Sequence, residues 1–590
     1  MELSPTALTV LERRYLLKDE RRRVVETPEQ MFRRVATAIA KGDSPFGTPA
    51  DVAASSQEFY EVMSRLEFLP NSPTLMNAGA PLGQLMACFV LPIEDNLDSI
   101  FGTLRDAAHI QQSGGGTGFS FSHLRPAGDV VMTTKGTASG PISFMMIYDM
   151  ATEVMKRGGT RRGANMGILR VDHPDIFTFI TAKRDRTKLT NFNISVAVTD
   201  EFMRAVRRNE PFDLIHPTTR QPVQRVRARD IWDLMVEMAW ENGEPGVIFI
   251  DRINRDNPTP RLGEIEATNP CSEQPLLPYE ACCLGSVDLS KMLRQHNGRL
   301  VVDYPKLERT VRTAIRFLDN VVEVNRYPLP ETERICRGNR KIGLGVMGFA
   351  DMLILLGIPY NSNAALEKAE QVMRFVNECA KAASSELAKT RGPFPNFAGS
   401  AYDRPGGLRL RNATLTTVAP TGSISLIANC SSGIEPIFAL SYTRCILGGE
   451  ELPSVHPIFK SVAKRRGFYS SELMETIAER GSVQGLRQVP PDVQRLFVTA
   501  LDIEPEWHVR IQAGFQKYTD NGVSKTVNLP ADATTDDVRR AFSLAYELDC
   551  KGITVYRYGS RPAQVLSLSA YCLACGEDAL PGTEHGAANP

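Results

Sequence analysis

The chain has 590 residues, with 68 Lys and Arg against 68 Asp and Glu, so its formal net charge is zero. A neutral chain has no general electrostatic attraction to DNA, RNA or a membrane surface. No apolar run approaches the roughly 18 residues that span a bilayer, and the first residues lack a signal-peptide pattern. We therefore expect a cytoplasmic protein, whose 11 cysteines are catalytic, metal-binding or buried rather than structural disulfides.

Residues 1 to about 70 are predicted to form a helical region. The segments that begin at Ser4 and Thr27 each have a hydroxyl cap followed by a proline, which is a helix-start pattern. In the second segment Met31, Val35 and Ile39 recur at helical spacing.

From residue 71 to about 560, short apolar runs such as NISVAV, GVIFI, KIGLGVMGF, TLTTVAP and GITVYRY alternate with long helical stretches. Strand and helix alternation over this length predicts an α/β architecture with a largely parallel sheet or barrel. Residues 561–590 lose this periodicity and are expected to form a flexible tail.

The segment Asn269-Pro270-Cys271-Ser272-Glu273 carries the strongest local signal. Its prolines favour a rigid loop over a helix or central strand. Alternate residues of an extended segment point the same way, so Asn269, Cys271 and Glu273 would face one direction. A thiol beside a carboxylate and an amide suits chemistry on a hydroxylated substrate. A buried loop cysteine beside a surface glutamate is the competing interpretation.

Three more cysteines are candidates for a redox pair. Cys88 lies in the strand-like run ACFVLP, and Cys282 and Cys283 lie in YEACCLGS. Cys88 can pair with one of the other two if their Cα atoms lie within roughly 7 Å. The alternative is that all three are small buried apolar residues.

Cys572 and Cys575 form a CxxC motif in the tail. A structural zinc site normally needs four ligands, and the only nearby extra ligand is His585. The motif therefore favours a dithiol that exchanges with a disulfide elsewhere.

Three glycine-containing segments raise the question of nucleotide binding. Residues 419–425, APTGSIS, follow a predicted strand and could wrap a phosphate with backbone N–H groups, or form an ordinary turn into a helix. Residues 113–119 follow a helical stretch and lack GxGxxG spacing, so they do not fit a dinucleotide site. The basic, glycine-rich residues 158–167 fit either a loop near a nucleotide or a solvated surface.

Together these segments resemble the catalytic subunit of ribonucleotide reductase, most closely the adenosylcobalamin-dependent class II enzymes. The resemblance runs over nearly the whole chain and includes NSPTLMNAG, ACFVLPIEDNLDSI, SGGGTGFSFSHLRPAGD, KRGGTRRGANMG, NPCSEQPLLPYEAC, APTGSISLIANCSSGIEP and CKGITVYRYGSR. It implies a ten-stranded α/β barrel of two antiparallel halves, each with five parallel strands. A central finger loop at 266–290 would carry the thiol.

The resemblance assigns roles to the cysteines. Cys271 would form a thiyl radical and abstract the ribose 3′ hydrogen, Glu273 would take the 3′-hydroxyl proton, and Asn269 would orient the substrate. Cys88 and Cys282 would supply the reducing equivalents and end as a disulfide. Cys572 and Cys575 would reduce that disulfide and be reset by thioredoxin or a similar donor.

The resemblance also implies two nucleotide sites. The substrate phosphates would be held by Thr74, Thr421, Gly422, Ser423 and Ser425. Deoxynucleotide or ATP effectors would bind between about residues 95 and 165, at Asp95, Asn96, Leu97 and Arg161, and the chain would form a homodimer with the effector at its interface. Because the N-terminal segment is short for an ATP-cone, we do not expect control of the overall activity by ATP or dATP.

The expected activity is reduction of ribonucleotides, with diphosphates favoured over triphosphates. No adjacent Tyr-Tyr pair occurs near the C-terminal end, and Glu273 argues against a glycyl-radical enzyme. Adenosylcobalamin is therefore the implied radical source, and no metal site is expected. The alternatives are a class I-type large subunit that needs a separate radical-generating subunit, and a catalytically dead nucleotide-binding regulator.

Overall fold

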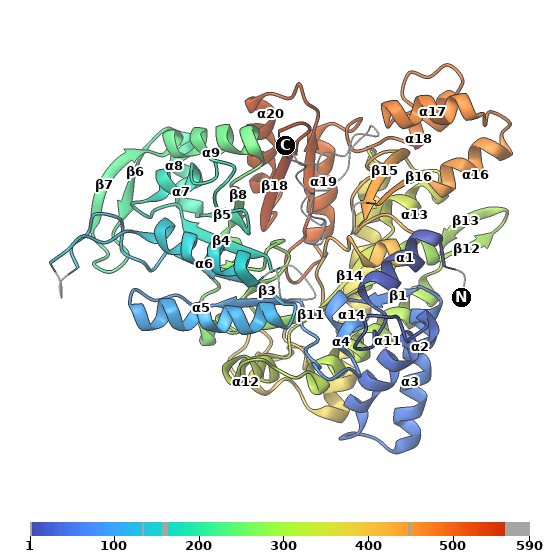
Figure 1. Cartoon of the computed structure of the whole chain (residues 1–590), viewed down its shortest axis with the longest axis horizontal. Coiled ribbons are helices and arrows are strands. Elements are labelled where there is room, and N and C mark those ends of the chain that lie inside the picture. Colours follow the sequence, from blue (N-terminus) through green and yellow to red (C-terminus); the bar gives the residue numbers. More distant parts are fainter. Residues whose placement is uncertain (1–2, 132–134, 156–162, 447–449, 561–590) are drawn as a thin grey trace, which may run out of the picture.

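The computed structural model describes residues 3–131, 135–155, 163–446 and 450–560 (Figure 1). Three N-terminal helices lie at one side: α1 (Pro5–Arg14), α2 (Pro28–Ala40) and α3 (Pro49–Ser64). The helices α2 and α3 pack together, whereas α1 packs against α15 (Ile424–Ala428). Ser4 and Thr27 cap the first two as predicted, and Thr27 forms a reciprocal capping box. Met31, Val35 and Ile39 are fully buried.

The centre of the molecule is a closed barrel. Five parallel strands form its first half: β2 (Cys88–Leu91), β3 (Gly116–Ser120), β4 (Asn165–Arg170), β5 (Phe192–Val198) and β8 (Gly246–Phe249). The second half contains β11 (Ala281–Asp288), β14 (Ile342–Met347), a segment at 414–418, β17 (Thr526–Leu529) and β18 (Gly552–Arg557). The pairing between its members is also parallel.

Two antiparallel seams join the halves. β2 pairs with β11 at one seam, and β8 pairs with β18 at the other. Closure within the second half runs through single parallel bridges, Leu344 with Thr416 and Val418 with Val523. The predicted ten-stranded barrel is therefore confirmed. The run TLTTVAP, expected to be a full strand, forms only isolated bridges, because side chains such as that of Asp520 bond its backbone N–H groups.

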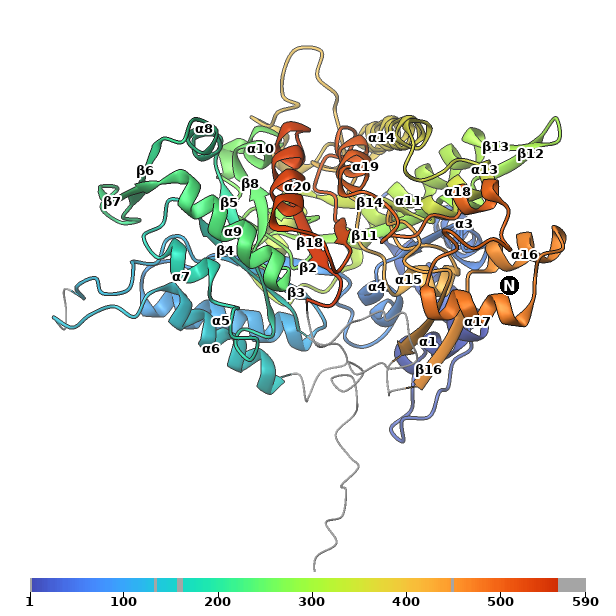
Figure 2. The same ribbon diagram turned by 90° about the horizontal axis from the view of Figure 1, so that it is seen from above.

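Helices cover the outside of the barrel in the βαβ manner. The helices α5 and α6 lie side by side along the outer edge of the half formed by β2 to β8, as both figures of the whole chain show (Figures 1 and 2). The main covering helices are α5 (Leu97–Gln112), α6 (Pro141–Met155), α7 (Ile176–Ile180), α8 (Asp200–Arg208), α9 (Ala228–Asn242), α11 (Tyr304–Val324), α13 (Phe349–Leu356), α14 (Asn363–Arg391), α19 (Pro505–Gln516) and α20 (Thr535–Glu547).

Shorter elements decorate this frame. Strand β1 (Phe68–Pro70) adds to β11 in antiparallel fashion. The hairpins are β6 (Pro211–Ile215) with β7 (Pro222–Arg227), β12 (Leu293–His296) with β13 (Arg299–Val302), and β15 (Ser441–Ile446) with β16 (Glu450–Val455). The remaining helices are α4 (Ser72–Asn77), α10 (Ile250–Arg255), α12 (Pro330–Asn339), α15 (Ile424–Ala428), α16 (Pro457–Arg465), α17 (Ser471–Arg480) and α18 (Pro491–Leu496).

A small hairpin enters the barrel as a finger, but it is shorter than the predicted loop at 266–290, because residues 281–288 form the barrel strand β11. Its strands β9 (Ala267–Thr268) and β10 (Pro275–Leu276) pair with each other, and β9 contacts β2, β3 and β4. The approach is close at Gly118, because a Cβ there would lie only 1.8 Å from the carbonyl oxygen of Thr268. None of the described helices has the length and apolar character needed to cross a membrane.

Candidate active site

The tip of the finger is a tight turn that presents Cys271 to a cavity. The N–H of Ser272 donates to the carbonyl of Asn269 at 3.0 Å, and Ser272 has a left-handed φ of 63°. The chain must reverse here because β9 and β10 are antiparallel. The expected extended conformation is therefore wrong: Cys271 is exposed, whereas Asn269 and Glu273 are buried.

The finger is bonded to both sides of the barrel. Asn269 Nδ2 donates to Cys88 Sγ at 3.1 Å. On the other side, the carbonyl of Glu273 accepts hydrogen bonds from Thr417 Oγ1 at 2.8 Å and from the N–H of Gly522 at 2.9 Å. These bonds hold the turn rigidly, as the many prolines of the segment suggested.

Cys88 and Cys282 are neighbours across the first seam. They are register partners in the antiparallel pair of β2 and β11, where directly opposite Cα atoms lie about 4.5–5.5 Å apart. That separation falls inside the range of roughly 4.4–6.8 Å that a disulfide accepts. Burial raises the pKa of the Cys282 thiol well above its usual range, so the sulfur keeps its proton. The pair can therefore give up two hydrogens and close to a disulfide.

Cys283 faces the opposite side of the same strand. Its Sγ donates to the carbonyl of Leu318 on α11 at 3.4 Å, and its side chain packs in the outer core. Cys88 and Cys282 share a separate apolar cluster inside the barrel. Of the two candidates that the sequence left open, the structure brings Cys282 to Cys88.

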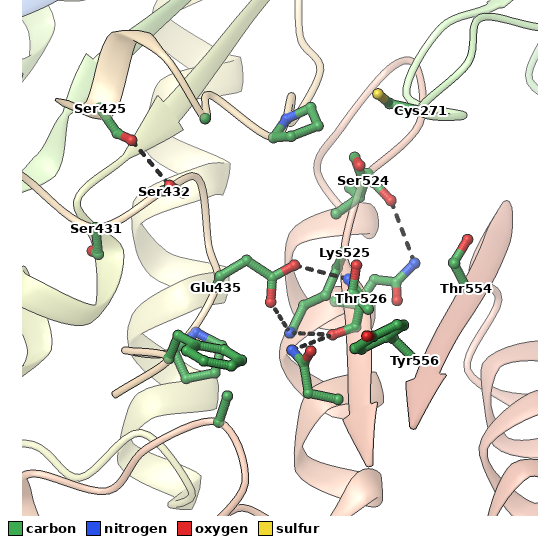
Figure 3. A pocket seen from close by; sticks show the side chains of 18 of the residues that line it. Cys271, Ser425, Ser431, Ser432, Glu435, Ser524, Lys525, Thr526, Thr554 and Tyr556 are labelled. Carbon is green, nitrogen blue, oxygen red and sulfur yellow. Dashed lines mark hydrogen bonds and ion pairs between the residues drawn. The ribbon is translucent and has the colours of Figure 1, made fainter. Parts of the chain in front are cut away.

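The cavity in front of Cys271 has a volume of about 970 Å³, near the upper end of the roughly 300–1,000 Å³ that small-ligand sites span. Figure 3 shows Cys271 near Ser524 at one side, with strands β17 and β18 forming a wall. Polar side chains that line the cavity include those of Asn193, Ser425, Glu435, Lys525, Thr554 and Tyr556.

Sequence reasoning did not assign roles to two charged members of this wall. Glu435 lies within the quoted segment that ends in GIEP, but nothing in the sequence distinguishes it from a loop carboxylate. Lys525 reads as an ordinary lysine between polar residues, yet its side chain is 0% exposed and its ammonium bonds Glu435 at 2.6 Å. Both residues can be identified as candidates only from the folded structure, where they meet at the cavity.

The predicted phosphate segment forms the turn that leads into α15. Thr421 has a left-handed φ of 58°, and its Oγ1 accepts a hydrogen bond from the N–H of Gly433 at 2.7 Å. Gly422 and Ser425 line the cavity. A Cβ added to Gly422 would meet nothing within 4 Å, so the backbone of the turn is open on the cavity side.

Two other predicted substrate residues bond other parts of the protein. Ser423 Oγ accepts a hydrogen bond from Arg14 of α1 at 3.2 Å. Thr74 is buried in α4, where its Oγ1 donates to the carbonyl of Leu85 at 3.1 Å. Neither residue is among those that line the cavity.

A carboxylate cluster borders the same cavity. Asp351 binds His456 Nε2 at 2.9 Å and accepts a hydrogen bond from the N–H of Ser431 at 2.6 Å. The nearby Asp288 is fully buried and accepts two hydrogen bonds from Ser290, at 2.9 and 2.7 Å. Burial raises the pKa of the Asp288 carboxyl to about 7, so Asp288 exchanges its proton near neutral pH.

The predicted effector residues lie far along the chain from the finger, at the start of α5. Asn96 caps α5 through a bond from the N–H of Ser99 at 2.8 Å. Asp95 pairs with Arg125 at 2.8 Å, and Leu97 is 64% exposed. The structure does not join these residues to the cavity around Cys271.

Arg161, Cys572 and Cys575 lie outside the described residues. Their predicted roles in effector binding and in disulfide exchange stay predictions. Within the ranges that the structure covers, no group of His, Cys, Asp and Glu has the arrangement of a metal site.

Comparisons with known proteins agree with this geometry. The family model for the barrel domain of ribonucleotide reductase matches residues 86–556, and the model for its all-alpha domain matches residues 1–83. A vitamin B12-dependent ribonucleoside-diphosphate reductase of Thermoplasma acidophilum is 49% identical, over 96% of this chain and 80% of the relative. The enzyme of the same name from Mycobacterium tuberculosis is 51% identical, over 97% of this chain and 80% of the relative.

A solved structure has the same fold. The alpha subunit of the class Id ribonucleotide reductase of Actinobacillus ureae superposes with a TM-score of 0.77 at 23% identity, and the match covers 94% of this chain and 97% of that subunit.

Proposed function

Because the chain belongs to the ribonucleotide reductase family, we propose that it is a B12-dependent ribonucleoside-diphosphate reductase that works through a thiyl radical on Cys271. One observation carries the proposal. An exposed thiol on a rigid finger faces a cavity, and Asn269 of the same finger donates a hydrogen bond to Cys88, one of two thiols in disulfide register. Three thiols in two distinct environments are what the reduction of a ribose carbon needs.

The residues divide the reaction as follows. The Cys271 radical takes the 3′ hydrogen of the ribose, and Glu273 takes the proton of the 3′-hydroxyl. The 2′-hydroxyl leaves as water, with a proton from the pair Cys88 and Cys282. That pair gives two electrons and two protons in total: one proton leaves in the water, one hydrogen fills C2′, and the two sulfurs close to a disulfide. Glu273 returns its proton to the 3′ oxygen. Cys271 then returns the 3′ hydrogen and is ready for another turn.

The cavity fits the radical source that the relatives' names imply. It is large, it reaches the exposed Cys271, and one side is apolar through residues such as Pro436, Ile437 and Phe438. These residues and the wall of β17 and β18 would hold adenosylcobalamin. When bound, that group supplies a carbon-centred radical by homolysis of its cobalt–carbon bond.

The substrate phosphates would bind at the turn of residues 421–425. Its open backbone at Gly422 and the hydroxyl of Ser425 face the cavity, and backbone N–H groups in such a turn bind anions. Thr421 and Ser423 would support the turn through their bonds to Gly433 and Arg14. Thr74 would act on the substrate only indirectly, because it does not line the cavity.

A homodimer is the expected assembly. The outer faces of α5 and α6 expose a set of large apolar side chains, which favours a protein partner over solvent. This apolar face is continuous with the effector residues Asp95, Asn96 and Leu97 at the start of α5, so a second copy would bring two effector sites to one interface. The exposed side chains are those of Leu97, Phe101, Met146, Ile147, Met150 and Val154.

Regulation and re-reduction complete the proposal. Deoxynucleoside triphosphates or ATP would bind as specificity effectors at this interface, with Arg161 in contact. Cys572 and Cys575 would reduce the Cys88–Cys282 disulfide and be reset by thioredoxin or a similar dithiol protein.

The decisive experiment is an anaerobic assay of the purified chain alone. CDP, dithiothreitol and dTTP are supplied with and without adenosylcobalamin, and deoxycytidine product is measured after dephosphorylation. Product that requires adenosylcobalamin and disappears in Cys271→Ser supports the proposal. Activity that needs a second protein and ignores cobalamin would instead indicate a class I-type large subunit.

The dimer has a separate test. Met150→Asp places a charge in the apolar face and should shift the mass measured by light scattering toward the monomer. Replacement of the exposed Glu472 by glutamine serves as the control and should leave the mass unchanged.

A further inference from the structure

We propose that Glu435 is a binding residue for the 2′,3′-diol of an adenosine group, namely the adenosyl part of the cofactor, and that Lys525 is its positioning residue. This inference rests on the proposed function. It assigns a polar anchor on the side of Cys271 that faces away from the thiol pair.

The ammonium of Lys525 bonds only groups of the protein, and Glu435 is the carboxylate among them. This ammonium donates to Glu435 Oε2 at 2.6 Å and to the carbonyl of Thr526 at 3.0 Å (Figure 3). It also donates to His508 Nδ1 at 2.9 Å. His508 Nε2 donates to the carbonyl of Ala500 at 3.2 Å, which leaves Nδ1 as the acceptor. An ammonium has three protons, and all three are used inside the protein.

Glu435, by contrast, keeps acceptor capacity toward the cavity. Its Oε2 binds Lys525 and its Oε1 accepts a hydrogen bond from the N–H of Thr526 at 2.8 Å. An ionised carboxylate has about four acceptor sites, so about two remain. The side chain is 26% exposed and lines the cavity. The two internal bonds fix its orientation before any ligand arrives.

The chemistry of a fixed carboxylate selects its ligand. It repels phosphate and accepts hydrogen bonds from hydroxyl or amino groups. A ribose diol offers two adjacent O–H donors, and carboxylates bind ribose hydroxyls in this way in dinucleotide sites. Because the carboxylate is already desolvated on its Lys525 side, such charge-assisted bonds are strong.

The position of Glu435 in the barrel indicates whether it binds the ribose of the substrate or the ribose of the adenosyl group. Cys88 and Cys282 lie at the seam of β2 and β11, and the substrate ribose must contact them. Glu435 is held by residues of β17, which pairs with β18 beside the other seam. The ligand that approaches Cys271 from this side is therefore the radical source and not the substrate.

The test measures how a change in the ligand and a change in the protein together affect the binding affinity. Adenosine and 2′,3′-dideoxyadenosine are titrated by calorimetry into the full chain, as wild type and as Glu435→Gln. We expect the wild type to bind adenosine at least about tenfold more tightly than the dideoxy compound, since bonds to a charged group are worth this much. In Glu435→Gln the two affinities should lie within about twofold of each other.

Two further variants serve as controls for this measurement. Glu435→Gln leaves the Lys525 charge buried without its carboxylate, so the pair is also removed together in Glu435→Gln/Lys525→Met, which avoids an isolated buried charge. It should lose the preference for the diol to the same extent. The exposed Glu472→Gln is the matched control and should keep the full preference.

The outcomes separate this inference from the proposed function. An equal diol preference in wild type and in both Glu435 variants overturns it, and so does failure of the wild type to bind adenosine at millimolar concentration. A raised KM for CDP in Glu435→Gln, without loss of the adenosine preference, would assign Glu435 to the substrate instead. Adenosylcobalamin-dependent product formation by the wild type is measured in parallel, and it upholds the proposed function whichever way the titrations turn out.

Discussion

Replacement of Gly118 by alanine should move the finger and slow turnover without unfolding the protein. A Cβ at this position would lie 1.8 Å from the carbonyl oxygen and 2.8 Å from the carbonyl carbon of Thr268. Ordinary contact distances are about 3.5 Å, so the finger strand must retreat by roughly 1.5 Å. Cys271 is three residues further along the same hairpin, and it must move with that strand.

A misplacement of about 1 Å costs roughly a hundredfold in rate, equivalent to about 2.7 kcal/mol of activation free energy. We therefore expect Gly118→Ala to lower kcat about a hundredfold in the anaerobic CDP assay, with little change in KM. The control is Gly116→Ala on the same face of β3, whose Cβ would meet the ring of Pro270 at 3.2 Å and the carbonyl oxygen of Ala164 at 3.7 Å. It should stay within about fivefold of wild type. If a folded Gly118→Ala kept more than a tenth of the wild-type kcat, β3 would not set the position of the thiol.

Three further predictions follow from the same geometry. Cys282→Ser should abolish multiple turnovers with dithiothreitol because it removes half of the thiol pair, whereas Cys283→Ser should stay within a few-fold of wild type because its sulfur faces α11. Asp288 has a pKa of about 7 in the folded protein against about 4 in an unfolded chain. Because the folded state binds this proton more tightly, the wild type should lose stability as the pH rises from about 4 to 7. Asp288→Asn should lack that part of the dependence in urea titrations across this pH range. Asp43 is buried among Arg316, Arg391 and Asn320. Its replacement by alanine should lower the free energy of unfolding by about 3 kcal/mol. An unchanged urea midpoint would contradict the role of Asp43 in joining the N-terminal helices to α11 and α14.

Much of the barrel could be predicted because its strands and helices carry their own periodicity. The caps at Ser4 and Thr27 and the apolar runs of β5, β8, β14 and β18 are local signals, and local physics was sufficient for them. The segment at 414–418 shows the limit. Its apolar residues looked like a strand, but the backbone of Leu415 and Thr416 bonds the Asp520 side chain, a long-range partner that no local pattern reveals.

The candidate site divides in the same way. Cys271, Asn269 and Glu273 were predicted as site residues because they are close in sequence and flanked by prolines, although the expected period-two geometry failed at the turn. The choice between Cys282 and Cys283 depends on which face of β11 points inward, and adjacent cysteines give the same composition in either register. Glu435 and Lys525 are 90 residues apart in the chain. A buried lysine and a surface lysine look alike in a sequence, so their ion pair required the fold.

In the proposed mechanism, the seam of β2 and β11 and the finger turn together keep the radical thiol apart from the disulfide pair. A disulfide needs two Cα atoms in direct register, and the seam of β2 and β11 supplies that for Cys88 and Cys282. A radical thiol must not join that disulfide, and Cys271 is kept apart because the finger turn exposes it to the cavity while Asn269 binds Cys88. Cys283 is excluded by the pleat of the strand, which turns successive side chains to opposite faces. The separation of one-electron from two-electron chemistry is thus set by backbone geometry, and it would be lost if either the finger or the seam shifted by a single residue.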